Sequence, residues 1–157
     1  AGPVLAMRKE PVLPEDNAET LGERLFALGP ALFEEALSKG PAAGIHQDET
    51  QATRAPKLKK EEARLDWKED AETLARKVRA FRPWPVAEAN LPSGRVLKVW
   101  KASALLGSSG SPGEILKGGE GLTIACGRGG ALRLEEVQSP GRGRMSTEAF
   151  LRGVRSP

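Results

Sequence analysis

Apolar residues between positions 18 and 38 recur at the three- and four-residue spacing of a helix. Asp16 or Asn17 can cap its start, so the pattern predicts an amphipathic helix over 18–38. Gly29-Pro30 interrupts it, because proline lacks an amide hydrogen, and predicts a kink or two abutting helices. This segment cannot bury its own apolar stripe, so we expect either a preceding part of the chain or the second half to cover it. The stripe consists of Leu21, Leu25, Leu28, Leu32, Ala36 and Leu37.

Residues 40–56 are small and polar and show no periodicity, which is typical of a linker. The single histidine, His46, lies in this segment. No second metal ligand or orienting partner accompanies it, so we interpret His46 as incidental to function.

A second domain is predicted to start near Lys57. Asp70 has the character of an N-cap, and Leu74, Val78 and Phe81 lie on one face of a helix that ends before Pro83. Strand-like apolar runs follow at 96–100, 114–116, 122–126 and 131–137, separated by glycine-rich breaks. This alternation predicts a small, mainly β barrel or sandwich.

A short final helix is predicted over 147–152, capped by Ser146. Its Phe150 and Leu151 can cover one open side of the sheet.

The composition is that of a globular chain, with 39% hydrophobic and 29% charged residues among 157. No apolar run approaches the roughly 20 residues that cross a bilayer, so we expect a cytoplasmic protein with no membrane partner. Cys126 is the only cysteine, which excludes an internal disulfide. It lies in an apolar run, where we expect a buried, unreactive thiol.

The net charge of +3 is unevenly distributed. Residues 1–56 hold five Lys/Arg and nine Asp/Glu, a balance of −4, whereas residues 57–157 hold nineteen and twelve, a balance of +7. The basic half suits a polyanionic partner such as a nucleic acid. The same excess of positive charge is also explained by a basic surface that is exposed to solvent and binds no partner.

The candidate nucleic-acid contacts are basic residues in three clusters. One cluster lies where the linker meets the second domain, one on a strand, and one on a glycine-rich loop. If side chains alternate strictly along this strand, Lys98 lies on the same face of the sheet as Val96 and Trp100, and Lys101 lies on the opposite face. The candidates are Lys57, Lys59 and Lys60; Arg95, Lys98 and Lys101; and Arg142 and Arg144.

Three tryptophans, Trp67, Trp84 and Trp100, could stack on bases, but with so few aromatic residues we expect them to fill the core.

No catalytic, cofactor-binding or metal-binding residues are predicted. The glycine-rich segments lack the lysine and hydroxyl of a phosphate-binding loop, and no Cys/His cluster exists. Adjacent carboxylates at 34–35, 61–62 and 135–136 point in different directions.

Six strings stand out, in order, along the second half: LKKEEARLDW (58–67), RAFRPWP (79–85), LKVWKA (97–102), PGEIL (112–116), ALRLEEVQ (131–138) and RMSTEAFLRG (144–153). Together they resemble the C-terminal domain of the methionyl-tRNA formyltransferase family. The resemblance covers nearly all of 58–153. It implies a small open β-barrel, similar to an oligonucleotide-binding (OB) fold, with flanking helices.

The beginning of the chain resembles the end of that family's Rossmann-like α/β catalytic domain. Ala1 and Gly2 match the last two positions of its Asp-x-Gly motif, so the catalytic aspartate would precede Ala1. The resemblance therefore implies a catalytic-domain remnant at 1–40, a linker at 41–57 and the barrel at 58–157.

The implied activity of the parent is formyl transfer from 10-formyltetrahydrofolate to methionyl initiator tRNA, in translation initiation. This chain would bind the tRNA, pack as a monomer on the N-terminal catalytic domain, and be inactive alone, without binding the folate or a metal. Two alternatives are a stand-alone basic OB-like module and the C-terminal part of another folate-dependent formyltransferase.

Overall fold

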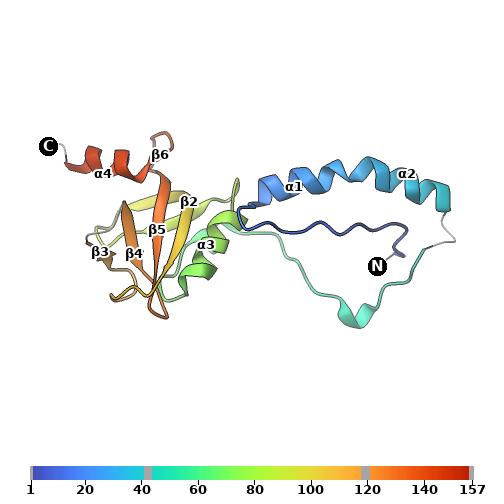
Figure 1. The fold of residues 1–157 in the computed structure, drawn as a ribbon, viewed down its shortest axis with the longest axis horizontal. Helices are drawn as coiled ribbons and strands as arrows, with labels where there is room; N and C mark the ends of the chain where they lie inside the picture. Colours follow the sequence, from blue (N-terminus) through green and yellow to red (C-terminus); the bar gives the residue numbers. More distant parts are fainter. Residues whose placement is uncertain (1, 41–43, 118–120, 156–157) are drawn as a thin grey trace. The chain divides into compact units, whose positions relative to one another are not determined.

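The computed structural model describes residues 2–40, 44–117 and 121–155 and forms two compact units, Ala1–Lys57 and Leu58–Pro157 (Figure 1). Each unit has its own secondary structure.

The first unit contains an extended segment and two consecutive helices, α1 (Ala18–Ala27) and α2 (Gly29–Lys39). Asn17 is the N-cap of α1, since its side chain accepts hydrogen bonds from the backbone of Glu19 and Thr20. The predicted interruption at Gly29-Pro30 is confirmed, with the proline in the first turn of α2. A short 3₁₀ helix, η2 (Glu49–Gln51), follows, and Val4 and Ile45 pair through their backbones.

Apolar side chains of the first unit remain largely exposed. Phe26 is 85% exposed and Phe33 and Leu37 are each 66% exposed. Among the residues described in this unit, no hydrophobic side chain is buried. Of the predicted apolar stripe, Leu25 and Leu37 are exposed, whereas Leu21, Leu28, Leu32 and Ala36 are half-buried. The described part of this unit therefore has no buried core of its own.

The second unit is built around one antiparallel sheet in the order β1-β2-β5-β4-β3, with β6 paired to β5. It starts with η3 (Lys60–Ala63) and α3 (Ala71–Ala80). The strands are β1 (Ala87–Asn90), β2 (Val96–Leu106), β3 (Ile115–Leu116), β4 (Leu122–Ala125), β5 (Gly130–Gln138) and β6 (Met145–Ser146), and α4 (Thr147–Arg155) ends the unit.

Helix α3 packs on β2 and β5, while α4 contacts β4, β5 and β6 (Figure 1). Asp70 caps α3 by accepting a hydrogen bond from the Thr73 amide at 2.8 Å, and Leu74 and Val78 are buried against the sheet. Phe150 of α4 is buried in the core, as predicted for a covering helix. This mainly β half-barrel with flanking helices confirms the fold class predicted for the second unit.

The structure adds two strands that sequence patterning did not predict. Ala87–Asn90 has the sequence AEAN, whose residues have little preference for strands, and it becomes β1 by pairing with β2. Met145–Ser146 forms β6 only by pairing with Val137 and Glu136. In both cases the pairing partner determines the strand.

Two of the three tryptophans follow the predicted core packing. Trp100 is 8% exposed and Trp67 packs against the core, but Trp84 is 53% exposed, so the prediction is wrong for Trp84. Trp84 lies between Pro83 and Pro85, in the turn after α3, and does not belong to a helix or strand that could direct it inward.

Candidate nucleic-acid interface

Lys98 and Lys101 lie on the same face of the sheet. Lys98 is opposite Gln138 and Lys101 is opposite Glu136, two residues apart on β5. Trp100 is an extra residue between them, a β-bulge that resets the alternation. The predicted placement of the two lysines on opposite faces is therefore wrong.

Three of the predicted cations surround two adjoining hollows. The larger one, about 700 Å³, is lined by Arg95 and Arg142, together with residues of β2, β6 and α4. The smaller one, about 220 Å³, is lined by Lys98 and by Glu88, its cross-strand partner on β1. Val96, Ser139 and Pro140 belong to both hollows, so Arg95, Lys98 and Arg142 are brought together on one surface.

Both arginines are held by tight turns. The Leu91 amide donates to the Arg95 carbonyl at 2.9 Å in the β1–β2 turn. The Arg142 amide donates to the Ser139 carbonyl at 3.1 Å in the β5–β6 turn, where Gly141 has a φ of 71°. One backbone hydrogen bond therefore closes each of the two turns that carry these arginines.

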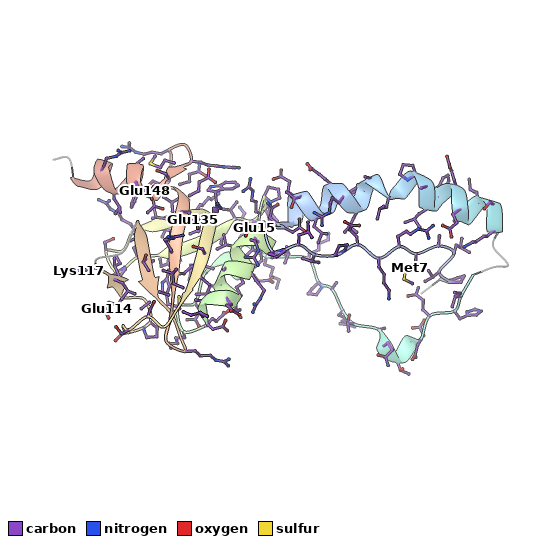
Figure 2. All side chains as sticks on the ribbon, in the orientation of Figure 1. Met7, Glu15, Glu114, Lys117, Glu135 and Glu148 are labelled. Atoms are coloured by element: carbon purple, nitrogen blue, oxygen red, sulfur yellow. The ribbon has the colours of Figure 1, made fainter. Side chains whose placement is uncertain are left out.

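The electrostatic environment distinguishes these cations from Lys101. Across the described ranges, Arg95, Lys98 and Arg142 form no ion pair, whereas Lys101 Nζ lies 3.0 Å from a carboxylate oxygen of Glu135. Burial raises the pKa of Glu135, but the hydrogen bond from Lys101 and the charges of Lys101 and Arg133 outweigh it and lower the pKa overall. Glu135, on β5 in Figure 2, is thus an anion that neutralises Lys101.

Arg144 is held by Trp100. Its guanidinium carbon lies 3.1 Å from the centroid of the Trp100 ring, a cation–π contact. The Trp100 indole donates to Gln138, whose amide in turn donates to the Arg142 carbonyl. The Arg144 side chain is thus engaged with Trp100, and Trp100 is linked through Gln138 to the turn that carries Arg142.

The structure does not bring Lys57, Lys59 and Lys60 into either hollow. All three are exposed; Lys57 ends the first unit, and Lys59 precedes η3, which begins at Lys60. After η3, the Leu65 amide donates to the Glu88 carbonyl, which attaches this segment to β1.

The apolar members of the larger hollow were not among the predicted site residues. Val96, Met145 and Phe150 come from β2, β6 and α4, and together they form its apolar wall. Each residue alone has the pattern of a core or strand position, so no local signal marks the three as one site.

No metal centre is evident in the described ranges, which hold no group of three or more His, Cys, Asp or Glu side chains suited to an ion. His46 lines a separate hollow of about 610 Å³ in the first unit, together with Met7, whose side chain is visible in Figure 2. Of the helices in the described parts, none is long and apolar enough to cross a membrane.

Comparison with known proteins identifies the second unit. The model of the family "Formyl transferase, C-terminal domain" matches residues 57–155. A methionyl-tRNA formyltransferase from Methylococcus capsulatus is 47% identical over 156 residues, covering 96% of this chain and 50% of that protein. One from Pseudomonas paraeruginosa is 48% identical over 144 residues, covering 89% of this chain and 46% of that protein.

The chain thus spans about half the length of the curated relatives that it matches. A crystal structure of HypX from Aquifex aeolicus, in complex with tetrahydrofolic acid, shares the fold with a TM-score of 0.68. It is 24% identical and covers 96% of this chain and 27% of HypX. On the family match and the named relatives, this chain belongs to the formyl transferase C-terminal domain family.

Proposed function

We propose that this chain is the C-terminal part of a methionyl-tRNA formyltransferase and that its role is to hold the tRNA. The whole enzyme would transfer a formyl group from 10-formyltetrahydrofolate to the amino group of methionyl initiator tRNA, in the cytoplasm. The proposal is supported by relatives of that name, which match at 47% identity along 96% of the chain.

The observation that carries the tRNA-binding role is the set of cations around the two hollows. Arg95, Lys98 and Arg142 share one surface and have no ion-pair partner in the described residues. Their charge is available to the phosphates of an RNA, which supply most of the sequence-independent affinity in such complexes. Lys57, Lys59 and Lys60 would extend the same role along the approach to η3.

The catalytic groups are expected in the part of the relatives that this chain does not span. The exposed apolar side chains of α1 and α2, such as Phe26 and Phe33, support packing against a catalytic domain. A stand-alone nucleic-acid module would have no use for this surface. The folate is a substrate of the whole enzyme, and we assign no residue of this chain to it; we expect a monomer.

Titration with tRNA at two salt concentrations tests the binding role. Three phosphate contacts predict that log affinity falls with log salt at a slope of about −2 to −3. Replacing Arg95, Lys98 and Arg142 with glutamine should flatten this slope. A matched control replaces Arg76, Lys117 and Arg128, which are also exposed in the second unit, and should leave binding nearly unchanged.

A salt-independent affinity, or equal losses in the two triple variants, would reject the proposed surface. A formylation assay of the chain alone, with methionyl-tRNA and 10-formyltetrahydrofolate, should show no turnover. Turnover would mean that this chain contains the reactive groups.

A further inference from the structure

The larger hollow combines two arginines with an apolar wall. Arg95 and Arg142 line it from the β1–β2 and β5–β6 turns, and Val96, Met145 and Phe150 provide apolar surface. None of the ten described residues that line it is acidic. Its lining therefore suits a ligand that is both anionic and apolar.

The size of the hollow suits a small ligand. Its volume of about 700 Å³ is within the range of ligand pockets, roughly 300–1,000 Å³. Phe150 is 9% exposed and therefore fixed in the core, while Val96 is 40% exposed and open to a ligand. The two turn hydrogen bonds hold the arginine backbones in place.

A nucleotide has the required combination of groups. Its base presents a flat, largely apolar face, and its phosphates carry the charge that arginine binds best. A fully paired helix presents phosphates but keeps its bases stacked, so it would leave the apolar wall facing water.

We propose that this hollow binds one unpaired nucleotide of the tRNA, with its base against Val96 and Met145 and its phosphates near Arg95 and Arg142. The inference rests on the proposed function, since it names the element of the RNA that the basic surface holds. An interface that contacts only the sugar-phosphate backbone of the RNA would use the same arginines without contacting the base.

Two RNA hairpins distinguish these cases. Both contain a single-nucleotide bulge, and they differ only in that one bulge carries adenine and the other is abasic, so the phosphate charge is identical. The 157-residue chain should bind the adenine hairpin roughly tenfold more tightly, because removing roughly 55 Å² of the apolar face of the base from water is enough for a change of this size.

Variants assign this difference to the hollow. Val96→Gln fills it with a larger polar side chain at an exposed position and should bring the affinities for the two hairpins together. Arg95→Gln and Arg142→Gln should weaken binding of both hairpins and lower the salt slope. Arg128→Gln is the control, since Arg128 is exposed at the opposite end of β5.

The possible outcomes distinguish failure of the nucleotide pocket from failure of the proposed tRNA binding. Equal affinity of the unmodified protein for both hairpins, with a steep salt slope, would leave tRNA binding in place and overturn the nucleotide pocket. A base preference that Val96→Gln does not alter would place the base elsewhere and also overturn it. No binding of either hairpin, even at low salt, would reject the proposed function and the pocket together.

Discussion

Arg144 and Trp100 form a stacked pair at the bulge of β2, with the guanidinium carbon 3.1 Å from the ring centroid. Trp100 Nε1 donates to Gln138 Oε1 at 2.9 Å, and Gln138 Nε2 donates to the Arg142 carbonyl at 2.8 Å. The bulge residue is thereby connected to the turn that presents Arg142. We infer that Trp100 positions the cations of this turn without contacting RNA itself.

Trp100→Phe should weaken tRNA binding although it changes no charge. The variant loses the indole hydrogen bond to Gln138 and weakens the stacking on Arg144, so the turn gains freedom. We expect the free energy of unfolding to fall by about 1 kcal/mol, measured by urea denaturation, with lower tRNA affinity in a parallel titration. Trp84→Phe is the matched control, because Trp84 is exposed. Unchanged affinity in Trp100→Phe would remove the positioning role.

Glu135→Gln should strengthen tRNA binding. In the unmodified protein Glu135 holds Lys101 at 3.0 Å, on the same face as Lys98. Removing the carboxylate charge makes the surface around Lys101 more positive, so the salt slope should become steeper. Lys101→Gln should cost less affinity than Lys98→Gln for the same reason. The idea fails if Lys101→Gln proves to be the more damaging change in a filter-binding titration.

The sequence predicted those elements that depend on contacts between residues close together in the chain. Asn17, Asp70 and Gly29-Pro30 determine where helices begin or break through contacts within a few residues, and the structure confirms all three. The fold class followed in the same way from short apolar runs between glycine-rich breaks. Strand β1 could not be predicted, because its sequence becomes a strand only through its pairing with β2.

The candidate site was predicted only in part, because its geometry depends on contacts between distant residues. Arg95 and Arg142 lie 47 positions apart in the chain, and nothing local shows that two turns meet at one hollow. The bulge at Trp100 is equally invisible, since it appears only in the register of β2 against β5. The prediction from strictly alternating side chains, that Lys98 and Lys101 lie on opposite faces of the sheet, was therefore wrong.

Gly127→Ala should destabilise the second unit. A Cβ at this position would collide with the Lys68 carbonyl, and the Gly127 amide donates to the carbonyls of Trp67 and Glu69, each at 2.9 Å. The two backbones can only separate, at a cost of about 1–3 kcal/mol in the free energy of unfolding. Gly143→Ala is the control, since a Cβ there meets nothing within 4 Å. Equal denaturation midpoints for the two variants would contradict the close approach.

Cys126 should resist thiol reagents in the folded protein. The residue is 2% exposed, and burial raises the pKa of its thiol to about 11 from an ordinary 9.0. At pH about 8 we expect labelling only after denaturation. Because the folded-state pKa is the higher one, the contribution of the protonated thiol to stability is complete below pH 9 and is lost as the pH rises towards 11. Rapid labelling of the native protein would contradict this burial.

Acid should loosen the first unit through Asp16. Arg24 donates to its two carboxylate oxygens at 2.6 and 2.7 Å, and the Leu13 amide donates at 2.7 Å. The hydrogen bonds from Arg24, then from Leu13, lower the pKa of Asp16 below its ordinary 3.8 against the effect of burial. A lowered folded-state pKa means that the stabilisation is present above 3.8 and is lost as the pH falls below it.

Amide hydrogen exchange across α1 should therefore accelerate below pH 3.8, after correction for the intrinsic exchange rate. The Asp16→Asn variant should already exchange faster than the unmodified protein at neutral pH and should change little further in acid. The reason is that the amide side chain at position 16 carries no charge to pair with Arg24. Glu15→Gln is the matched control, because Glu15 is the exposed neighbour in the same turn (Figure 2). If the Asp16 and Glu15 variants exchange alike at every pH, the Asp16–Arg24 pair does not hold the start of α1.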